Sequence, residues 1–232
     1  MSQFSNPTHS IPEISIRAPS SISTSTSNDN TKIPSHPPPP TTFLTSSPWS
    51  VTYSTLPIWR SKRNVKITYQ SLPQGFLDDQ VTYQTCQGGS VKTVHGVDRP
   101  VFMSGQRQDL DKHGNANSDS DAEAGSWAYH WRGKGWLMIA SSKWEVLGYG
   151  SVPGDADGGG GGMGDEGQSI DWAVTYFAKT LFTPEGIDIY SRPSAKLPAT
   201  LVEQIKKGLK ATGDESFQRL VGDLFLVTHD EG

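Results

Sequence analysis

The sequence predicts an all-β protein in which eight antiparallel strands form an up-and-down barrel, with a C-terminal α-helix packed outside it. Three observations predict this class. Short runs of alternating apolar and polar residues recur along the chain, as in strands with one buried face. The connections between most of these runs are short, which favours antiparallel neighbours. Eight such strands favour closure into a barrel, because closure removes both exposed edges.

We expect the barrel domain to occupy residues 47–232, after an N-terminal extension. Residues 1–46 are rich in Ser, Thr and Pro, and they include four consecutive prolines, Pro37 to Pro40. Such a segment buries too little apolar surface to offset its chain entropy, so we expect it to be disordered. The proline run is either a stiff linker or a ligand for a proline-motif-binding protein.

The predicted strands follow from period-two alternation bounded by turn residues. They cover residues 49–56, 64–72, 79–86, 90–97, 127–140, 143–149, 170–178 and 187–192. Gly133 and Gly135 predict a bulge or bend in the fifth strand. Two polar stretches, 99–125 and 150–168, are expected to be mobile loops inserted between strands.

The chain changes its pattern after the last of these strands. Pro193 ends the ladder because it lacks a backbone N–H donor. Apolar residues then recur with helical spacing over about 197–213, which predicts a helix with one apolar face. A second helical turn at 215–221 and a short strand or extended tail at 224–227 complete the prediction.

Composition limits the function. The net charge of −4 gives no general attraction to nucleic acid. Cys86 is the only cysteine, so no intrachain disulfide can form, which indicates a reducing compartment. No apolar run has the length of a membrane span or the character of a secretory leader. We therefore expect a cytoplasmic protein.

The sequence contains no strong catalytic or metal-binding motif. It lacks metal-ligand spacing, a phosphate loop and a nucleophile elbow, so we expect neither a metal nor a cofactor. The carboxylates of Asp78 and Asp79 are expected to be solvated in a turn. His95 and His130 lie in predicted strands, where each either faces a cavity as an acid, base or haem ligand or, as we expect, is hydrogen-bonded or faces solvent.

Aromatic residues are the distinctive resource of the chain. All seven tryptophans lie between Trp49 and Trp172, and Trp127, Tyr129 and Trp131 alternate on one strand face. Large aromatic walls with few charges suit a pocket for an apolar ligand. The same residues are also suited to filling the barrel as plain core, and both interpretations stay open.

The order of these blocks resembles the lipocalin family, closest to its bacterial-type and apolipoprotein-D-like branch. The matching residues are Trp49 with the Leu56-Pro57 that follows it, the run 65–69, the run 170–174, and the run 189–192 before a helix. In that family an arginine after the last strand packs over the first-strand tryptophan at the closed barrel end. The resemblance, which covers about residues 47–227, implies that Trp49 and Arg192 form this structural pair.

The resemblance also implies a function. It implies a non-enzymatic carrier of a small hydrophobic ligand, such as a fatty acid or lysolipid, held inside the barrel. The candidate ligand-binding wall consists of Tyr53, Ile67, Tyr69, Trp131, Met138, Trp144, Val146, Val174 and Tyr176.

Two other interpretations stay open. One is an isomerase or cyclase in the same barrel, with His130 or Tyr69 as the acid or base. The other concerns the basic cluster at 60–63, which the barrel places at its open rim. This cluster is either a solvated loop or a contact for a ligand carboxylate or an anionic lipid headgroup, which would give a peripheral membrane contact.

Overall fold

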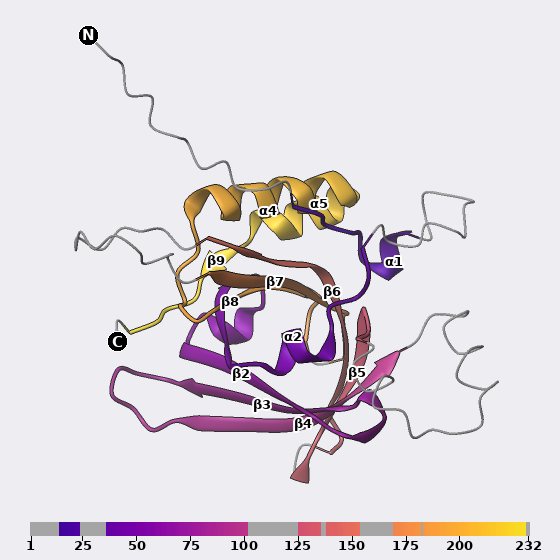
Figure 1. Cartoon of the computed structure of the whole chain (residues 1–232). Coiled ribbons are helices and arrows are strands. Elements are labelled where there is room, and N and C mark those ends of the chain that lie inside the picture. The colour runs from indigo at the N-terminus through magenta and orange to yellow at the C-terminus, as the bar shows by residue number, and fades with distance from the viewer. Residues whose placement is uncertain are drawn as a thin grey trace, which may run out of the picture.

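The computed structural model describes residues 14–23, 36–101, 125–135, 138–153, 169–181 and 183–230. Within this part of the chain a single antiparallel sheet has the strand order β2-β3-β4-β5-β6-β7-β8-β1-β9 (Figure 1). The strands are β1 (Trp49–Ser54), β2 (Arg63–Ser71), β3 (Leu77–Gln84), β4 (Lys92–Val101), β5 (Ala128–Gly133), β6 (Ser141–Val152), β7 (Ile170–Phe177), β8 (Gly186–Arg192) and β9 (Phe225–Leu226). The helices are α1 (Ser20–Ser23), α2 (Thr41–Thr45), η1 (Pro57–Trp59), η2 (Pro73–Gly75), α4 (Ala199–Thr212) and α5 (Glu215–Gly222).

The sheet closes into a barrel through β1. This strand pairs with β8 along its length and also with β2, where Trp49 lies opposite Ile67 and Ser50 opposite Lys66. The predicted eight-stranded up-and-down barrel is therefore confirmed, and β9 adds a short ninth strand beside β1. In this topology the β1–β2, β3–β4, β5–β6 and β7–β8 connections gather at one end, the open end. The other end, where the chain enters β1, is the closed end.

One predicted strand differs from the structure. The run 127–140 is not one strand, because β5 ends at Gly133 and residues 138–139 form a turn. Gly135 adopts a φ of 61°, a left-handed conformation that suits glycine at this turn. Trp136 and most of the two predicted loops, at 102–124 and 154–168, lie outside the described residues.

Apolar side chains form two clusters, one on each side of the barrel wall. The inner cluster fills the barrel, and Trp49, Tyr69, Tyr129 and Trp144 are among its buried members. The outer cluster lies between the wall and the two helices α4 and α5, which run side by side over β7 and β8 (Figure 1). Every residue of β8 is consequently buried.

Helix α4 confirms the predicted C-terminal helix, which packs outside the barrel. Its buried residues Leu201, Ile205 and Leu209 recur at helical spacing and belong to the outer cluster. Helix α5 follows after Gly213, with Asp214 as its N-cap accepting a hydrogen bond from the Phe217 backbone at 2.9 Å.

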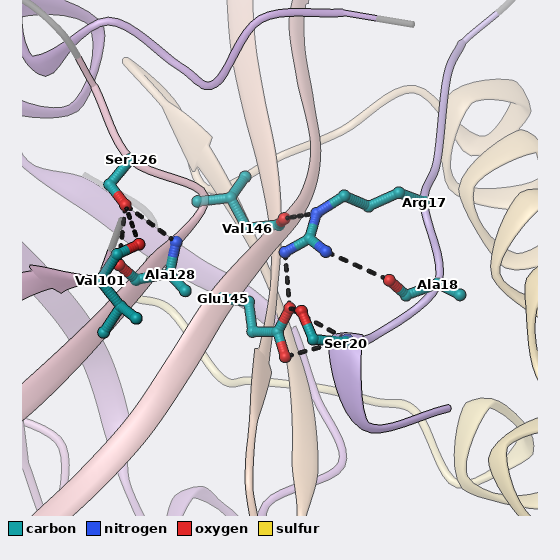
Figure 2. Close-up of polar contacts among 8 residues, drawn as sticks. All are labelled: Arg17, Ala18, Ser20, Val101, Ser126, Ala128, Glu145 and Val146. Carbon is teal, nitrogen blue, oxygen red and sulfur yellow. Dashed lines mark hydrogen bonds and ion pairs between the residues drawn. The ribbon is translucent and has the colours of Figure 1, made fainter. Parts of the chain in front are cut away.

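Two stretches of the N-terminal extension are packed on the barrel. Residues 14–23, which we call the strap, run along β6 (Figure 2). Arg17 donates from Nε to the Val146 carbonyl at 2.8 Å, and its guanidinium pairs with the Glu145 carboxylate at 2.6 Å. Ser20 donates to the same carboxylate from both its backbone and its hydroxyl. The expectation of a segment without packed structure does not hold for this stretch.

Helix α2 is the second packed stretch, and it covers the closed end. Leu44 is buried in the inner cluster, and its carbonyl accepts a hydrogen bond from the Trp49 indole at 2.9 Å. The Phe43 ring lies 5.4 Å from the Trp49 ring and 5.2 Å from the Tyr149 ring. Because these rings meet at the closed end of the barrel, α2 blocks this end, and we call this helix the plug.

Candidate ligand site inside the barrel

Arg192 connects the elements that meet at the closed end of the barrel. Its guanidinium lies over the Trp49 ring, 3.9 Å from the centroid, and it also approaches the Phe43 ring. It donates to the Asp171 carboxylate at 2.9 Å and to the Phe43 carbonyl at 2.6 Å. The side chain is buried, so one residue links the last strand, the first strand and the plug.

The structure places only part of the predicted ligand-binding wall inside the barrel. Ile67, Tyr69, Trp144 and Val146 are buried in the inner cluster, and Trp131 packs against it partly buried. These five share one site because inward-facing positions of β2, β5 and β6 alternate along each strand.

The other four predicted wall residues lie elsewhere. Val174 and Tyr176 are buried in the outer cluster beneath the helices, and Tyr53 packs against that cluster too. Met138 is 60% exposed in the β5–β6 turn. Placing Val174, Tyr176 and Tyr53 on the inner face is wrong because the helices bury the outer face of β7 equally well. Both faces of the strand then carry apolar residues, and alternation cannot tell them apart.

Three carboxyl groups are buried with the aromatic rings. Asp79, Asp98 and Asp188 are 7%, 0% and 1% exposed. The expectation of a solvated turn at Asp78 and Asp79 is wrong, since β3 already begins at Leu77 and turns Asp79 inward. An acid in an alternating strand resembles a solvent-facing position, so the sequence pattern does not predict this cluster.

Asp79 and Asp98 form a pair on adjacent strands. In the register of β3 and β4, Leu77 lies opposite Asp98 and Asp79 lies opposite Gly96, so the two acids are diagonal neighbours on one face. Asp98 Oδ1 accepts a hydrogen bond from the Trp144 indole at 2.7 Å. Asp98 Oδ2 and Asp79 Oδ1 are buried and have no hydrogen-bond partner among the described residues. Buried polar atoms are rarely left without a partner, so these two oxygens mark a site that can accept donors.

Burial sets the charge of this pair. It raises the pKa of Asp79 to about 7, with the nearby Asp78 charge adding to the rise and a hydrogen bond from Trp131 opposing it. Burial also raises the pKa of Asp98 well above its usual range, and the neighbouring Asp79 raises it further. At least one of the two carboxyls is therefore protonated at neutral pH unless a cation lies beside them.

Aromatic rings frame the pair. Trp144 stacks between Tyr129, with 4.6 Å between ring centroids, and Tyr69, with 5.8 Å. Tyr69 stands directly opposite Asp79 in the β2–β3 register. Trp131 lies against Gly96, where any side chain would collide with the indole. The site thus combines two acceptor oxygens with flat apolar walls.

Asp188 differs from the other two acids because both of its oxygens have partners. Ser54 donates to Oδ1, and the Trp59 indole donates to Oδ2 at 3.2 Å. Trp59 belongs to η1 in the β1–β2 connection, and its ring packs 6.3 Å from that of Tyr83. Asp188 therefore fixes an aromatic side chain at the open end.

The residues predicted for an enzymatic alternative do not form a catalytic pair. His130 is exposed on β5, and His95 bonds to Asp78 rather than to a group of the inner cluster. Tyr69 is inside, but burial raises its pKa well above the ordinary value, which keeps it neutral. Across the described part of the chain, no group of three or more His, Cys, Asp or Glu residues is arranged to hold a metal ion.

The buried acids predict a stability that depends on pH. Burial raises the pKa of Asp188, like that of Asp79, to about 7, whereas an unfolded aspartate has a pKa of about 3.9. The contribution of these carboxyls to the free energy of unfolding is therefore highest below pH ~4, where they are protonated in both the folded and the unfolded state. It falls as pH rises to about 7, by up to about 1.4 kcal/mol per pH unit for each carboxyl. Urea titrations from pH 4.5 to 8 should show this fall. Asp79→Asn should make the fall shallower by the share of that one carboxyl, while the exposed Asp223→Asn should leave it unchanged. A free energy of unfolding that rises over this range would contradict the burial of these acids.

The fold is that of a lipocalin-like barrel, an up-and-down antiparallel barrel with helices packed outside it, so the predicted fold is confirmed. A scan against models of known protein families finds no match, and neither does a search of curated proteins. Similar solved structures include H1 crustacyanin from the lobster Homarus americanus, at 12% identity and a TM-score of 0.46, over 89% of this chain and 81% of that one. Another is the siderocalin Ex-FABP, at 11% identity and a TM-score of 0.43, over 80% of this chain and 93% of that one.

Proposed function

We propose that this protein binds a small molecule inside its barrel, and that the ligand presents a cationic or hydrogen-bond-donating group to Asp79 and Asp98. The observation that carries the proposal is the pair of buried carboxyl oxygens without partners. The stacked rings of Tyr69, Trp144 and Tyr129 would hold an apolar or aromatic ligand body beside them.

The open end supplies the route of entry. Several aromatic members of the inner cluster are only partly buried and lie at that end, and those on strand ends or connections include Trp59, Tyr83, Trp131 and Phe177. The plug α2 and buried Arg192 cover the closed end instead. A ligand that enters among these aromatic rings would reach the acid pair without displacing the plug.

The buried acids bear on the ligand expected from the sequence, a fatty acid or lysolipid. The chain of either ligand would suit the aromatic walls. A carboxylate beside Asp79 and Asp98 would place like charges together in a site of low polarity, which disfavours its ionised form. An amine would instead ionise the pair, and a charge-assisted hydrogen bond is roughly twice as strong as a neutral one.

Ligands with one tail and different head groups test this proposal. We expect dodecylamine to bind most tightly, dodecanol less tightly and dodecanoate least, when each is titrated by calorimetry below its micelle concentration. Amine binding to the protonated pair should also release a proton. The apparent enthalpy should therefore vary with the ionisation enthalpy of the buffer.

Matched variants locate the site. Asp98→Asn should weaken dodecylamine by about ten- to a hundredfold, the range of a hydrogen bond to a charged group, and should leave dodecanol little changed. The exposed Asp223→Asn is the control. Equal binding of all three ligands, unchanged by Asp98→Asn, would place the ligand elsewhere. One alternative is a pocket of about 210 Å³ outside the barrel, which Trp127, Trp172 and residues of the strap line.

A further inference from the structure

Exposed apolar side chains gather at the open end of the barrel. Seven large hydrophobic residues are exposed in the described part of the chain, and five of them lie on the four connections at this end. These five, which we call the apolar rim, are Ile58, Val91, Met138, Ile139 and Leu181. Ile139 and Leu181 are 91% and 95% exposed. Scattered exposed apolar residues need no explanation, but one on every connection of a single barrel end marks an interaction surface.

The charge of the same connections is opposite to that of the whole chain. Residues 55–62, 85–91, 134–140 and 178–185 contain four basic residues and one acid, a net charge of +3, whereas the chain carries −4. The basic residues are Arg60, Lys62, Lys134 and Lys179. All but Lys62 are exposed, and Lys134 is paired with the Asp78 carboxylate. The charges of exposed Arg60 and Lys179 are therefore the ones available to a partner.

We infer that the open end docks on a membrane surface that contains anionic lipids. Basic residues near an anionic leaflet each contribute roughly 1 kcal/mol, and apolar side chains beside them enter the headgroup region. A protein partner would need complementary pockets, whereas a lipid surface accepts separate apolar tips on several loops. None of the described helices has the length and apolarity of a membrane span, so the contact is peripheral.

Vesicle sedimentation with the full chain tests the inference. The protein should co-sediment with vesicles of phosphatidylcholine mixed with phosphatidylserine and should remain in the supernatant with pure phosphatidylcholine. Added salt should weaken the binding, because it screens the contribution of the basic residues.

Two double variants separate the apolar and the basic contributions. Ile139→Ser with Leu181→Ser should weaken vesicle binding about tenfold or more, since both side chains lose their apolar contact. Arg60→Gln with Lys179→Gln should weaken it by about ten- to thirtyfold, the equivalent of two lost basic residues. All four positions are exposed, so the fold should survive, which circular dichroism would check.

The chain offers matched controls away from this end. Val101 is the last residue of β4, lies at the closed end and is 47% exposed. The Val101→Ser variant should therefore bind vesicles like the wild type. Arg219 is exposed on α5, and Arg219→Gln should do the same. The inference would be overturned if the wild-type protein did not bind anionic vesicles. It would also be overturned if the control variants lost binding as strongly as the rim variants. A wild-type dimer in sedimentation velocity that the apolar variant makes monomeric would identify the rim as a self-association surface instead.

Discussion

Arg192→Ala should lower the free energy of unfolding by about 3 kcal/mol or more, the range found when one partner of a buried ion pair is removed. The change removes the cation–π contact with Trp49 and the donors to Asp171 and to the Phe43 carbonyl. It also leaves the partly buried Phe43 carbonyl without this donor, which adds a desolvation cost to the lost hydrogen bond. Urea denaturation at neutral pH measures the effect.

Two further variants show whether the geometry or the charge of Arg192 accounts for its contribution to stability. Arg192→Lys should restore only part of the stability, because an ammonium lacks the planar fork that spans Asp171 and Phe43. Arg219→Ala, at a pair whose side chains are 73% and 92% exposed, should change stability by no more than about 0.5 kcal/mol. If Arg192→Ala melts like the wild type, the closed end is held together by the apolar contacts alone.

Deletion of residues 1–46 should destabilise the barrel by about 3–5 kcal/mol, comparable to truncating one or two core side chains. The deletion removes the buried Leu44 and the Phe43 ring from the inner cluster. It also leaves the Trp49 indole without its acceptor and Arg192 without the Phe43 carbonyl. Thermal and urea denaturation of the two proteins provide the measurement.

Shorter deletions divide this effect between the strap and the plug. Removal of residues 1–35 takes away the strap contacts with Glu145 and Val146 but keeps α2, so we expect a smaller loss. Removal of residues 1–13 keeps both and is the control. Leu44→Ala alone should cost about 2–5 kcal/mol. A barrel without residues 1–46 that is as stable as the full chain would show that the plug contributes nothing.

The sequence predicted the fold better than the site, for physical reasons. Turn residues and period-two alternation mark strands wherever one face contacts solvent, so the sequence predicts all eight barrel strands. The bounds of the fifth strand are wrong, because β5 ends at Gly133 and the predicted strand runs to residue 140. Alternation fails in β7 and β8, where α4 and α5 bury the outer face, and Val174 was therefore assigned to the wrong side. The register shifts between Val51 and Tyr53 and between Val146 and Gly148 invert parity in the same way.

The sequence does not predict the acid pair or the strap, for a different reason. Asp79 and Asp98 are nineteen residues apart in sequence, and only the pairing of β3 with β4 in the closed barrel brings them to the same face. Residues 14–17 hold two isoleucines and an arginine within a polar segment. Their partners, Glu145 and Val146, are more than a hundred residues away in sequence. Composition averages over a window of sequence and therefore misses an isolated contact of this kind.

Strand β9 has a consequence for association between molecules. β1 pairs with β2 only through Trp49 and Ser50, so its second half would present free backbone groups on that side. β9 occupies this gap: Leu226 pairs with Tyr53, Phe225 with Ser54, and the Thr228 carbonyl accepts the Asn64 N–H at 2.9 Å. Unpaired strand edges are templates for intermolecular sheet growth. The C-terminal strand therefore protects this incomplete junction of the barrel against strand addition from a neighbouring molecule.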